Sequence, residues 1–465
     1  MSINPFIEVA QLSEGLLSGK HTATEVLNFY AHRIEKYDPK LNAFTYLDWQ
    51  ASFKLAKASD KRRAAGFPLS PLDGVPFAIK DSFEVKGWSL NAGSLALKGN
   101  VSSKTSTTVK RLLEAGMVLV GKTQMVELAY GGWGTNQNMG TPNNPWDMQQ
   151  PRIPGGSSSG SATVVAAGLL PMAMGTDTGG SIRIPAALQG LTGYKPRQAI
   201  SSLEGVYPLS PTLDVAGPLV RSARDADYIT KILNRKQIKV CEKQPPNDLD
   251  SRNDNSPLSG VRIAAMPETD YKKVVENDIL IAMRAATNKL KQLGAEVIET
   301  PFPIDIEKIR EITSLLIGTE GWALHGHLIQ RSTALVSDAV ANRMRDGEKT
   351  LASAYIHALG ERKKDMIYWH HWLQGFDAYI TPSLAKTACL IEQVDESVNP
   401  LSAFLRSGNY LDVNAISIPI GCSKKGLPIG LQFLGKGADE YQLLAICEII
   451  QQHTNWHKQH PEGLS

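Results

Sequence analysis

The stretch RIPGGSSSGSATVVAAGLLPMAMGTDTGGSIRIPAALQGLTGYKP, residues 152–196, decides the fold. It contains two Gly/Ser loops, at 155–161 and 175–181. Between them, an apolar run at 162–170 predicts a short buried helix, and the apolar residues 172–174 predict a buried strand. A flexible linker lacks the interleaved Val, Leu, Met and Pro that demand burial here. We therefore expect the two loops to face each other and form a site.

The glycine pair before Ser181 indicates acyl-transfer chemistry. Glycine lets the backbone turn sharply and expose consecutive N–H groups toward one point. Such donors stabilise an oxyanion, and each one removed costs about 3–4 kcal/mol of transition-state stabilisation. Ser181 directly follows Gly179-Gly180, so its hydroxyl would lie beside these donors.

This stretch resembles the signature of the amidase signature family of hydrolases, in which a Lys-Ser-Ser triad replaces Ser-His-Asp. Ser157, the first serine after the first glycine pair, precedes Ser181 by the 24 positions that are typical of the family. The family's lysine lies in a V-P-F-A-[IV]-K-D context, matched by Val75-Pro-Phe-Ala-Ile-Lys80-Asp81. The resemblance covers residues 72–218, and further similar segments occur near the C-terminus. Ser159 stands where the family commonly has glycine.

The resemblance implies a role for each site residue. Ser181 is the expected nucleophile, and Ser157 is expected to relay the Ser181 proton to neutral Lys80. The peptide bond between Gly156 and Ser157 is expected to be cis, which lets the Ser157 hydroxyl reach both Ser181 and Lys80. The expected oxyanion donors are the backbone N–H groups of Thr178, Gly179, Gly180 and Ser181. Asp177 and Arg183 are expected to brace the loop. No cofactor or metal is expected.

The surroundings of Lys80 support its role as a base. A lysine that ends a strand is most often a surface residue, but Lys80 closes the apolar run 75–79. Burial disfavours the charged ammonium and lowers the pKa of a lysine toward neutrality.

Helical and strand patterns alternate along the chain, which is typical of an α/β protein. The resemblance implies a central, mixed, twisted β-sheet sandwiched by α-helices. We expect a single domain over 1–465, with its core at about 66–220 and 376–455 and a helical substrate-entrance region at about 265–375. Residues 236–257 are polar and predict an exposed connector. Asp38-Pro39 is expected to end the second N-terminal helix.

Composition excludes several functional classes. The 465 residues include 49 basic and 46 acidic ones, a net charge of +3, so nothing suggests a nucleic-acid or anionic-membrane footprint. Four cysteines without a CxxC motif favour buried thiols in a reducing compartment. The sequence lacks the features of a signal peptide or a membrane span, so a cytoplasmic protein is expected.

Three other interpretations compete for the same residues. Residues 156–160 satisfy G-x-S-x-G, which would make Ser158 the nucleophile, but no buried strand precedes it. No phosphate-binding loop motif is present. His325, His327, His370 and His371 lack the spacing of a metal site. The family resemblance also implies that the N-P-W-D segment at 144–147 borders the active site.

The sequence thus predicts an amidase that hydrolyses a linear carboxamide to a carboxylate and ammonia or an amine, through an acyl-enzyme. The alternative is the glutaminase-type member of a tRNA-dependent amidotransferase, although residues 355–376 do not resemble that protein. A non-catalytic binding protein on this scaffold is a third interpretation, disfavoured by the complete triad. The expected partner is a small-molecule amide, with no membrane, and no nucleic acid outside an amidotransferase. Whether the chain forms a homodimer, and which amide it takes, is left open.

Overall fold

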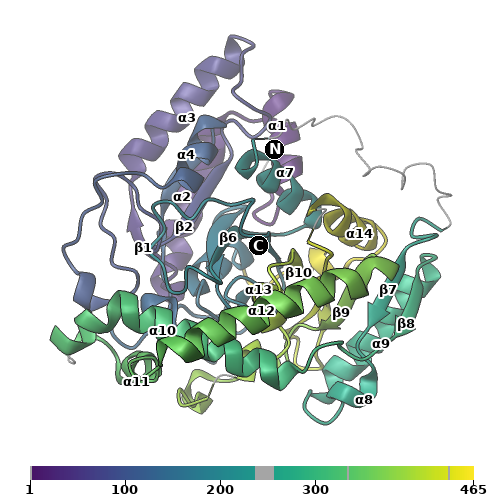
Figure 1. The fold of residues 1–465 in the computed structure, drawn as a ribbon. Coiled ribbons are helices and arrows are strands. Elements are labelled where there is room, and N and C mark those ends of the chain that lie inside the picture. The colour runs from purple at the N-terminus through teal and green to yellow at the C-terminus, as the bar shows by residue number, and fades with distance from the viewer. Residues whose placement is uncertain (1–2, 236–255, 332–334, 399, 438–439, 465) are drawn as a thin grey trace.

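The computed structural model describes residues 3–235, 256–331, 335–398, 400–437 and 440–464 (Figure 1). The predicted connector therefore lies almost wholly outside the described residues, as does one of the four cysteines. Among the described residues, no helix is long and apolar enough to cross a membrane.

An eleven-stranded mixed sheet forms the centre of the fold, in the order β1-β3-β2-β4-β6-β5-β10-β11-β9-β7-β8. The strands are β1 (Phe44–Leu47), β2 (Pro76–Lys80), β3 (Val118–Thr123), β4 (Ala173–Asp177), β5 (Thr192–Lys195), β6 (Val215–Val220), β7 (Arg262–Ala265), β8 (Glu296–Glu299), β9 (Ala378–Pro382), β10 (Ala415–Cys422) and β11 (Pro428–Leu434).

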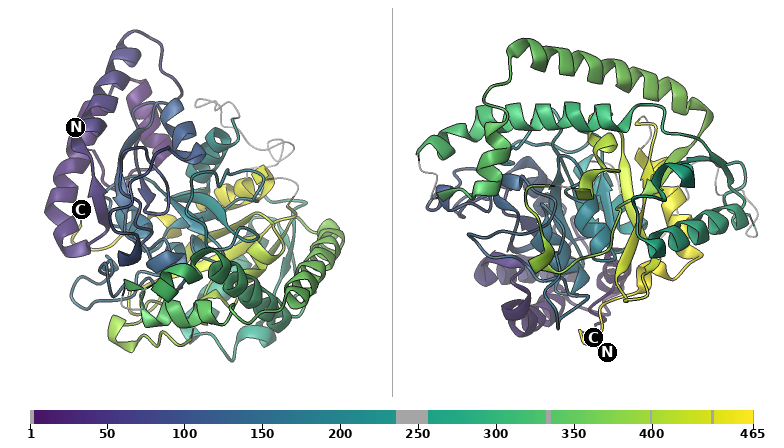
Figure 2. Two further views of the ribbon diagram at one scale, coloured as in Figure 1. Left: turned by 60° about the vertical axis from the view of Figure 1, so that its left-hand side comes forward. Right: turned by 90° about the horizontal axis from the view of Figure 1, so that it is seen from below.

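Helices cover both faces of this sheet, as Figures 1 and 2 show. The described α-helices are α1 (Val9–Leu17), α2 (Ala23–Leu41), α3 (Trp49–Ala64), α4 (Thr107–Glu114), α5 (Ser159–Ala166), α6 (Arg183–Leu188), α7 (Ala223–Leu233), α8 (Glu268–Tyr271), α9 (Asn277–Gln292), α10 (Ile306–Arg331), α11 (Asp338–Arg345), α12 (Ala352–Trp372), α13 (Arg406–Tyr410) and α14 (Glu440–Gln452). The predicted α/β architecture, with a mixed sheet between helical layers, is confirmed.

Strand pairing brings the catalytic candidates to one edge of the sheet. β2 pairs in parallel with both β3 and β4, whereas β6, β5, β10 and β11 continue the sheet through antiparallel pairs. Because β2 and β4 run in the same direction, their carboxyl ends lie side by side. Lys80 at the end of β2 is thereby brought close to Thr176 and Asp177 at the end of β4.

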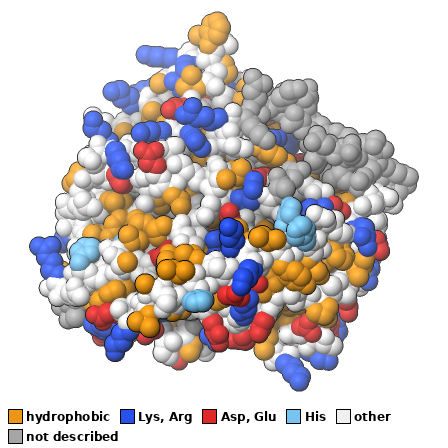
Figure 3. All heavy atoms as spheres, viewed as in Figure 1, with side chains coloured by type: hydrophobic (Ala, Val, Ile, Leu, Met, Phe, Trp, Pro, Cys, Tyr) orange, Lys and Arg blue, Asp and Glu red, His pale blue; other side chains and the backbone are white. Residues whose placement is uncertain are grey.

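The long helices α10 and α12 lie side by side across one face of the molecule, as the view from below in Figure 2 shows. On the face shown in Figure 3, Lys and Arg side chains are interspersed with Asp and Glu side chains. The two ends of the chain are also close, since the rings of Phe6 and His460 stack with centroids 4.1 Å apart.

Two local predictions need correction. Asp38-Pro39 does not end α2, which continues to Leu41 and stops only where Asn42 takes a left-handed conformation, with φ of 51°. Proline lacks an N–H, so Pro39 forgoes the helical hydrogen bond to the Glu35 carbonyl, but the chain stays helical and Asn42 N donates to the Asp38 carbonyl at 2.7 Å. The helix predicted at 162–170 begins earlier, at Ser159, so the first Gly/Ser loop is shorter than expected.

Candidate active site

Lys80, Ser157 and Ser181 come from three different segments. Lys80 ends β2, Ser157 lies two residues before α5, and Ser181 lies between β4 and α6. Lys80 and Ser157 are fully buried, whereas Ser181 retains 8% exposure. In a proton relay, the base and the relaying group are buried and the nucleophile is accessible to the substrate. The burial of Lys80 and Ser157, with Ser181 at the surface of a pocket, is consistent with this arrangement.

The Lys80 ammonium has two hydroxyl partners. Its Nζ lies 2.7 Å from Ser157 Oγ and 2.7 Å from Thr176 Oγ1. Burial lowers the pKa of Lys80 to about 7, even though the carboxylates of Asp214 and Asp177 act in the opposite direction. At neutral pH a large fraction of Lys80 is therefore uncharged and able to accept a proton. The Thr176 contact was not predicted, because a threonine within an apolar strand gives no signal of such a role.

Asp214 is a second ionisable group at this site that the sequence did not single out. Its carboxylate accepts hydrogen bonds from Thr178 Oγ1 at 2.5 Å and from the N–H groups of Leu209 and Ser210 at 2.8 and 3.0 Å. Burial raises the pKa of Asp214 to about 6. At neutral pH it therefore places a negative charge within electrostatic reach of Lys80.

The peptide bond between Gly156 and Ser157 is cis, as the family resemblance implied. Of the two contacts predicted for the Ser157 hydroxyl, the one with Lys80 is present. A hydrogen bond between the hydroxyls of Ser157 and Ser181 is not formed within the described part of the chain. The Ser181 side chain lines the neighbouring pocket instead.

A buried ion pair holds the second Gly/Ser loop. The Asp177 carboxylate accepts hydrogen bonds from Gly180 N and Ile182 N at 2.7 and 3.0 Å, and Arg183 Nη2 lies 3.0 Å away. Burial alone would raise the pKa of Asp177, but the Arg183 guanidinium and the N–H donors outweigh it and hold this pKa well below its usual range. The loop that carries Ser181 is thus tied to a fully buried carboxylate.

Arg183 extends this support to the C-terminal half of the chain. It donates to Gln432 Oε1 at 2.6 Å on β11, and to Asn409 Oδ1 at 2.7 Å and the Leu405 carbonyl at 2.8 Å. All of the hydrogen-bonding capacity of a guanidinium is directed into the protein here, so Arg183 has a structural position rather than access to a substrate.

The contact between Gly180 and Asp177 corrects the expected set of oxyanion donors. Because the Gly180 N–H donates to Asp177 Oδ1, it is not available to a substrate. The N–H groups of Thr178, Gly179 and Ser181 have no acceptor among the described residues. Gly180 has φ of 125°, a conformation that favours glycine and that turns the chain between these donors.

The environment of Ser158 does not suit a nucleophile. Its side chain is fully buried, and its hydroxyl bridges the backbone of Thr176, donating to the carbonyl at 3.1 Å and accepting from the N–H at 3.2 Å. No buried strand precedes it, since α5 follows an irregular loop. The match to G-x-S-x-G therefore does not mark a nucleophile elbow.

The segment 144–147, which was expected to border the active site, is not among the residues that line the pocket beside Ser181. Asn144 instead donates to the carbonyls of Ile153 and Leu188, at 3.0 and 3.2 Å. The Trp146 indole donates to the Gln189 carbonyl at 2.8 Å. These contacts hold the chain that leads into the first Gly/Ser loop against α6.

Within the described ranges, no group of three or more His, Cys, Asp or Glu side chains is arranged to hold a metal ion. His325, the most buried of the four histidines considered, has protein partners at both ring nitrogens. Its Nδ1 lies 3.3 Å from the Tyr207 hydroxyl, and its Nε2 lies 2.7 Å from the Pro208 carbonyl.

A pocket opens beside Ser181. Its wall is formed by residues from five parts of the chain, including Tyr130, Leu209, Ile317 on α10, and Arg406 at the start of α13. Burial raises the pKa of Tyr130 to about 12, so its phenol stays neutral. None of these wall residues was predicted, because each follows an ordinary helix or loop pattern and only the folded chain brings them together.

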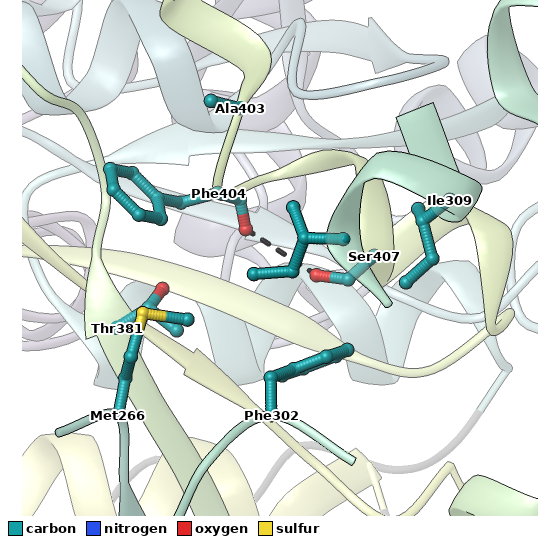
Figure 4. A pocket seen from close by; sticks show the side chains of 8 residues that line it. Met266, Phe302, Ile309, Thr381, Ala403, Phe404 and Ser407 are labelled. Carbon is teal, nitrogen blue, oxygen red and sulfur yellow. Dashed lines mark hydrogen bonds between the residues drawn. The ribbon is translucent and has the colours of Figure 1, made fainter. Parts of the chain in front are cut away.

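The segment 402–407 separates this pocket from a small second cavity (Figure 4). Ser402 and Arg406 face the pocket beside Ser181, whereas Phe404 and Ser407 face the second cavity. The Ser407 hydroxyl donates to the Phe404 carbonyl at 3.3 Å, the contact drawn in Figure 4. The segment that carries Ser402 and Arg406 thus also borders this small, mainly apolar cavity.

A sequence model of the amidase family matches residues 25–444. The chain is 33% identical to the A subunit of the glutamyl-tRNA(Gln) amidotransferase from Cupriavidus necator, over 99% of both chains. Its structure is similar to a crystal structure of an amidase, with 30% identity and a TM-score of 0.85 over 96% of this chain and 100% of the other. It is also similar to the peptide amidase of Stenotrophomonas maltophilia, with 27% identity and a TM-score of 0.80 over 96% and 97% of the two chains.

Proposed function

The chain belongs to the amidase family of hydrolases that act on amide C–N bonds, and from this premise we propose that it hydrolyses a linear carboxamide through an acyl-enzyme on Ser181. The observation that carries the proposal is the 2.7 Å contact between Lys80 Nζ and Ser157 Oγ, in a buried site beside the Ser181 loop. A lysine with a pKa of about 7 is matched to general base catalysis near neutral pH.

In the proposed reaction, the Ser181 oxygen attacks the carbonyl carbon of the amide. Its proton passes to the Ser157 oxygen as the Ser157 proton passes to neutral Lys80. When the tetrahedral intermediate collapses, the C–N bond breaks and the relay returns a proton to the departing nitrogen. A water molecule then attacks the acyl-enzyme by the same relay, releasing the carboxylate and restoring Ser181.

The Ser181 loop would stabilise the tetrahedral intermediate. The free N–H groups of Thr178, Gly179 and Ser181 are the proposed donors to the oxyanion, without Gly180. The ion pair of Asp177 with Arg183 keeps these donors in place before the substrate arrives, so they need little reorganisation during the reaction.

We also propose the extent of the catalytic unit. Residues 1–465 would act as a single amidase domain, with the core at about 66–220 and 376–455 and the helical substrate entrance within about 265–375. The position of Ile317, on α10 and in the pocket wall, supports the last assignment.

A second candidate function is that of the glutaminase component of a tRNA-dependent amidotransferase, which the similarity to the Cupriavidus necator protein favours. Such a component would use the same site to release ammonia from glutamine. At 33% identity, the resemblance supports the shared chemistry more strongly than a shared substrate.

Both candidates are tested by assaying the purified chain alone against a panel of linear amides and against glutamine, with product masses determined. We expect turnover of simple amides that is lost in Ser181→Ala and retained in Ser158→Ala. Preference for glutamine, increased by partner proteins, would favour the amidotransferase. Turnover that survives in Ser181→Ala would contradict the assignment of the nucleophile.

A further inference from the structure

The pocket beside Ser181 contains one formally charged side chain. Its other lining residues are aliphatic, glycine, or neutral hydroxyl residues such as Tyr130, Thr178 and Ser402. Arg406 alone brings a charge into this wall. A single cation in an otherwise uncharged pocket favours a substrate that carries a negative charge.

Arg406 is held by neutral acceptors rather than by a carboxylate. Its Nε donates to Ser402 Oγ at 2.9 Å. Its Nη1 lies within hydrogen-bond distance of three acceptors on α10, the Arg310 carbonyl at 3.1 Å, Thr313 Oγ1 at 3.1 Å and Ser314 Oγ at 2.6 Å. The guanidinium is therefore fixed in position, but among the described residues no carboxylate forms an ion pair with it. Glu307, which is itself paired with Arg310, acts on it only from farther away.

The remaining nitrogen of this guanidinium is available to a ligand. Nη2 of Arg406 has no hydrogen-bond partner in the described ranges of the chain. Burial lowers the pKa of Arg406, which shows that the charge is partly withdrawn from water. A guanidinium nevertheless stays protonated in proteins. A charge-assisted hydrogen bond from a bound anion would replace part of the hydration that Arg406 loses on burial.

The other charged groups nearby already have partners. Arg310 and Glu307, which both act on Arg406, form an ion pair of 2.6 Å with each other. Arg343, which donates to the Tyr130 carbonyl, forms an ion pair of 2.7 Å with Glu396. The Glu320 carboxylate accepts hydrogen bonds from Ser210 Oγ at 2.6 Å and from the Tyr355 hydroxyl at 2.7 Å. Arg406 is thus the cation that a substrate in this pocket would meet.

Arg406 also lies close to the proposed reaction centre. A methyl group placed on Gly179 would lie 3.7 Å from Arg406 Cγ, so the arginine stem passes directly beside the loop that carries Ser181. A substrate with its amide carbonyl at Ser181 could therefore reach the guanidinium through a short aliphatic chain.

We propose that Arg406 selects amides that carry a carboxylate a short chain away from the scissile bond. This inference rests on the proposed function, because it assigns the substrate class of the same site. Ser402 acts as a positioning residue for Arg406, and the contacts with α10 hold the guanidinium in the pocket wall.

The first test uses the wild-type protein and three amides of similar length. Glutaramate carries a carboxylate, glutaramide is its neutral isostere, and 5-aminopentanamide carries an ammonium. We expect kcat/KM to fall in that order, with glutaramate preferred over glutaramide by roughly 10- to 100-fold, as a charge-assisted hydrogen bond supplies. Equal rates, or a preference for the neutral or cationic amide, would overturn the inference while leaving the proposed amidase activity intact.

The second test assigns the selectivity to Arg406. Arg406→Gln is expected to reduce the ratio of kcat/KM for glutaramate over glutaramide by roughly 10- to 100-fold, and Arg406→Lys by less because it keeps the charge. Arg284→Gln is the matched control. It removes an exposed arginine charge on α9, paired with Glu268 and outside the pocket wall. An unchanged ratio in Arg406→Gln would refute the assignment.

Binding separates this inference from the proposed reaction. Calorimetric titration of Ser181→Ala with glutaramate measures recognition without turnover. Tighter binding of glutaramate than of glutaramide, if it is lost on adding Arg406→Gln, would support the role of Arg406 in recognition. If the wild-type protein then released no ammonia from glutaramate, only the proposed hydrolysis would be contradicted. Equal binding of the two amides would contradict the role of Arg406.

Discussion

Replacement of Lys80 by methionine tests the proposed base. At the ordinary lysine pKa of 10.5, about one lysine in 3,000 is neutral at pH 7, whereas a pKa of about 7 makes about half of the Lys80 side chains neutral. Burial therefore supplies most of the base that the relay uses. Removing a general base costs about 10²–10⁴-fold in rate, so Lys80→Met is expected to lose at least that much.

The pH profile gives the sharper measurement. In the wild-type protein, kcat/KM should rise about tenfold per pH unit below pH 7 and level off above it, because only neutral Lys80 accepts the proton. This inflection should be absent from the residual activity of Lys80→Met. Lys195→Met is the matched control, since Lys195 is also fully buried and its pKa is lowered to about 8, but it donates to the Pro196 carbonyl outside the pocket.

Stability provides an independent check on the same pKa. Because the folded state lowers the pKa of Lys80, the unfolded chain binds more protons between pH 7 and 10.5, and wild-type stability should rise with pH across that window. The free energy of unfolding of Lys80→Met, relative to wild type, should therefore fall by up to about 1.4 kcal/mol per pH unit there. A flat difference in urea unfolding, together with a retained inflection near pH 7 in the variant, would refute the reasoning.

Three further predictions concern the rest of the site. Ser158→Ala should keep turnover within tenfold of the wild-type rate and lose about 1–2 kcal/mol of stability in urea unfolding, because the Ser158 hydroxyl bonds only the Thr176 backbone. Loss of all turnover would instead restore Ser158 as the candidate nucleophile. Asp177→Asn should cost about 3–5 kcal/mol of stability, since it leaves buried Arg183 without its counter-ion, whereas Asp147→Asn, in a more exposed pair, should cost about 0–1 kcal/mol. Because the folded-state pKa of Asp177 is lowered, the contribution of its carboxylate to the free energy of unfolding should be complete above pH 3.8 and be lost as the pH falls below that value. Equal losses of stability in the two variants at pH 7 would contradict the structural role of Asp177. Exhaustive chelation should leave amide turnover unchanged, and reactivation of a chelated sample by zinc would show that the mechanism is wrong.

Local patterns in the sequence predicted the α/β class, whereas the mixed sheet and the triad candidates were implied by the family resemblance. Apolar runs such as 75–79 and the paired Gly/Ser loops mark buried strands and sharp turns directly. The strands β5 and β6 were not predicted. Their residues include Gly193 and Gly217, which weaken the strand pattern, and pairing with neighbouring strands decides their structure.

The pocket wall could not be predicted for a different reason. Arg406 lies 225 positions from Ser181, and its charge looks like that of any solvated helix residue until the fold places it beside Gly179. Gly180 illustrates the converse case, in which a motif residue has the expected position but its N–H is taken by Asp177. Hydrogen-bond partners are a property of three-dimensional packing, which a linear motif does not specify.

The origin of the pocket wall has a consequence for how this protein can diverge. The residues proposed for chemistry lie between 80 and 181, whereas Ile317, Ser402 and Arg406 come from later segments of the chain. Phe404 and Ser407, on the same segment as Ser402 and Arg406, line the small cavity of Figure 4. Mutations in the wall can thus alter which amides are accepted without disturbing the proton relay, so descendants of one ancestral hydrolase could acquire new substrates while inheriting the same reaction.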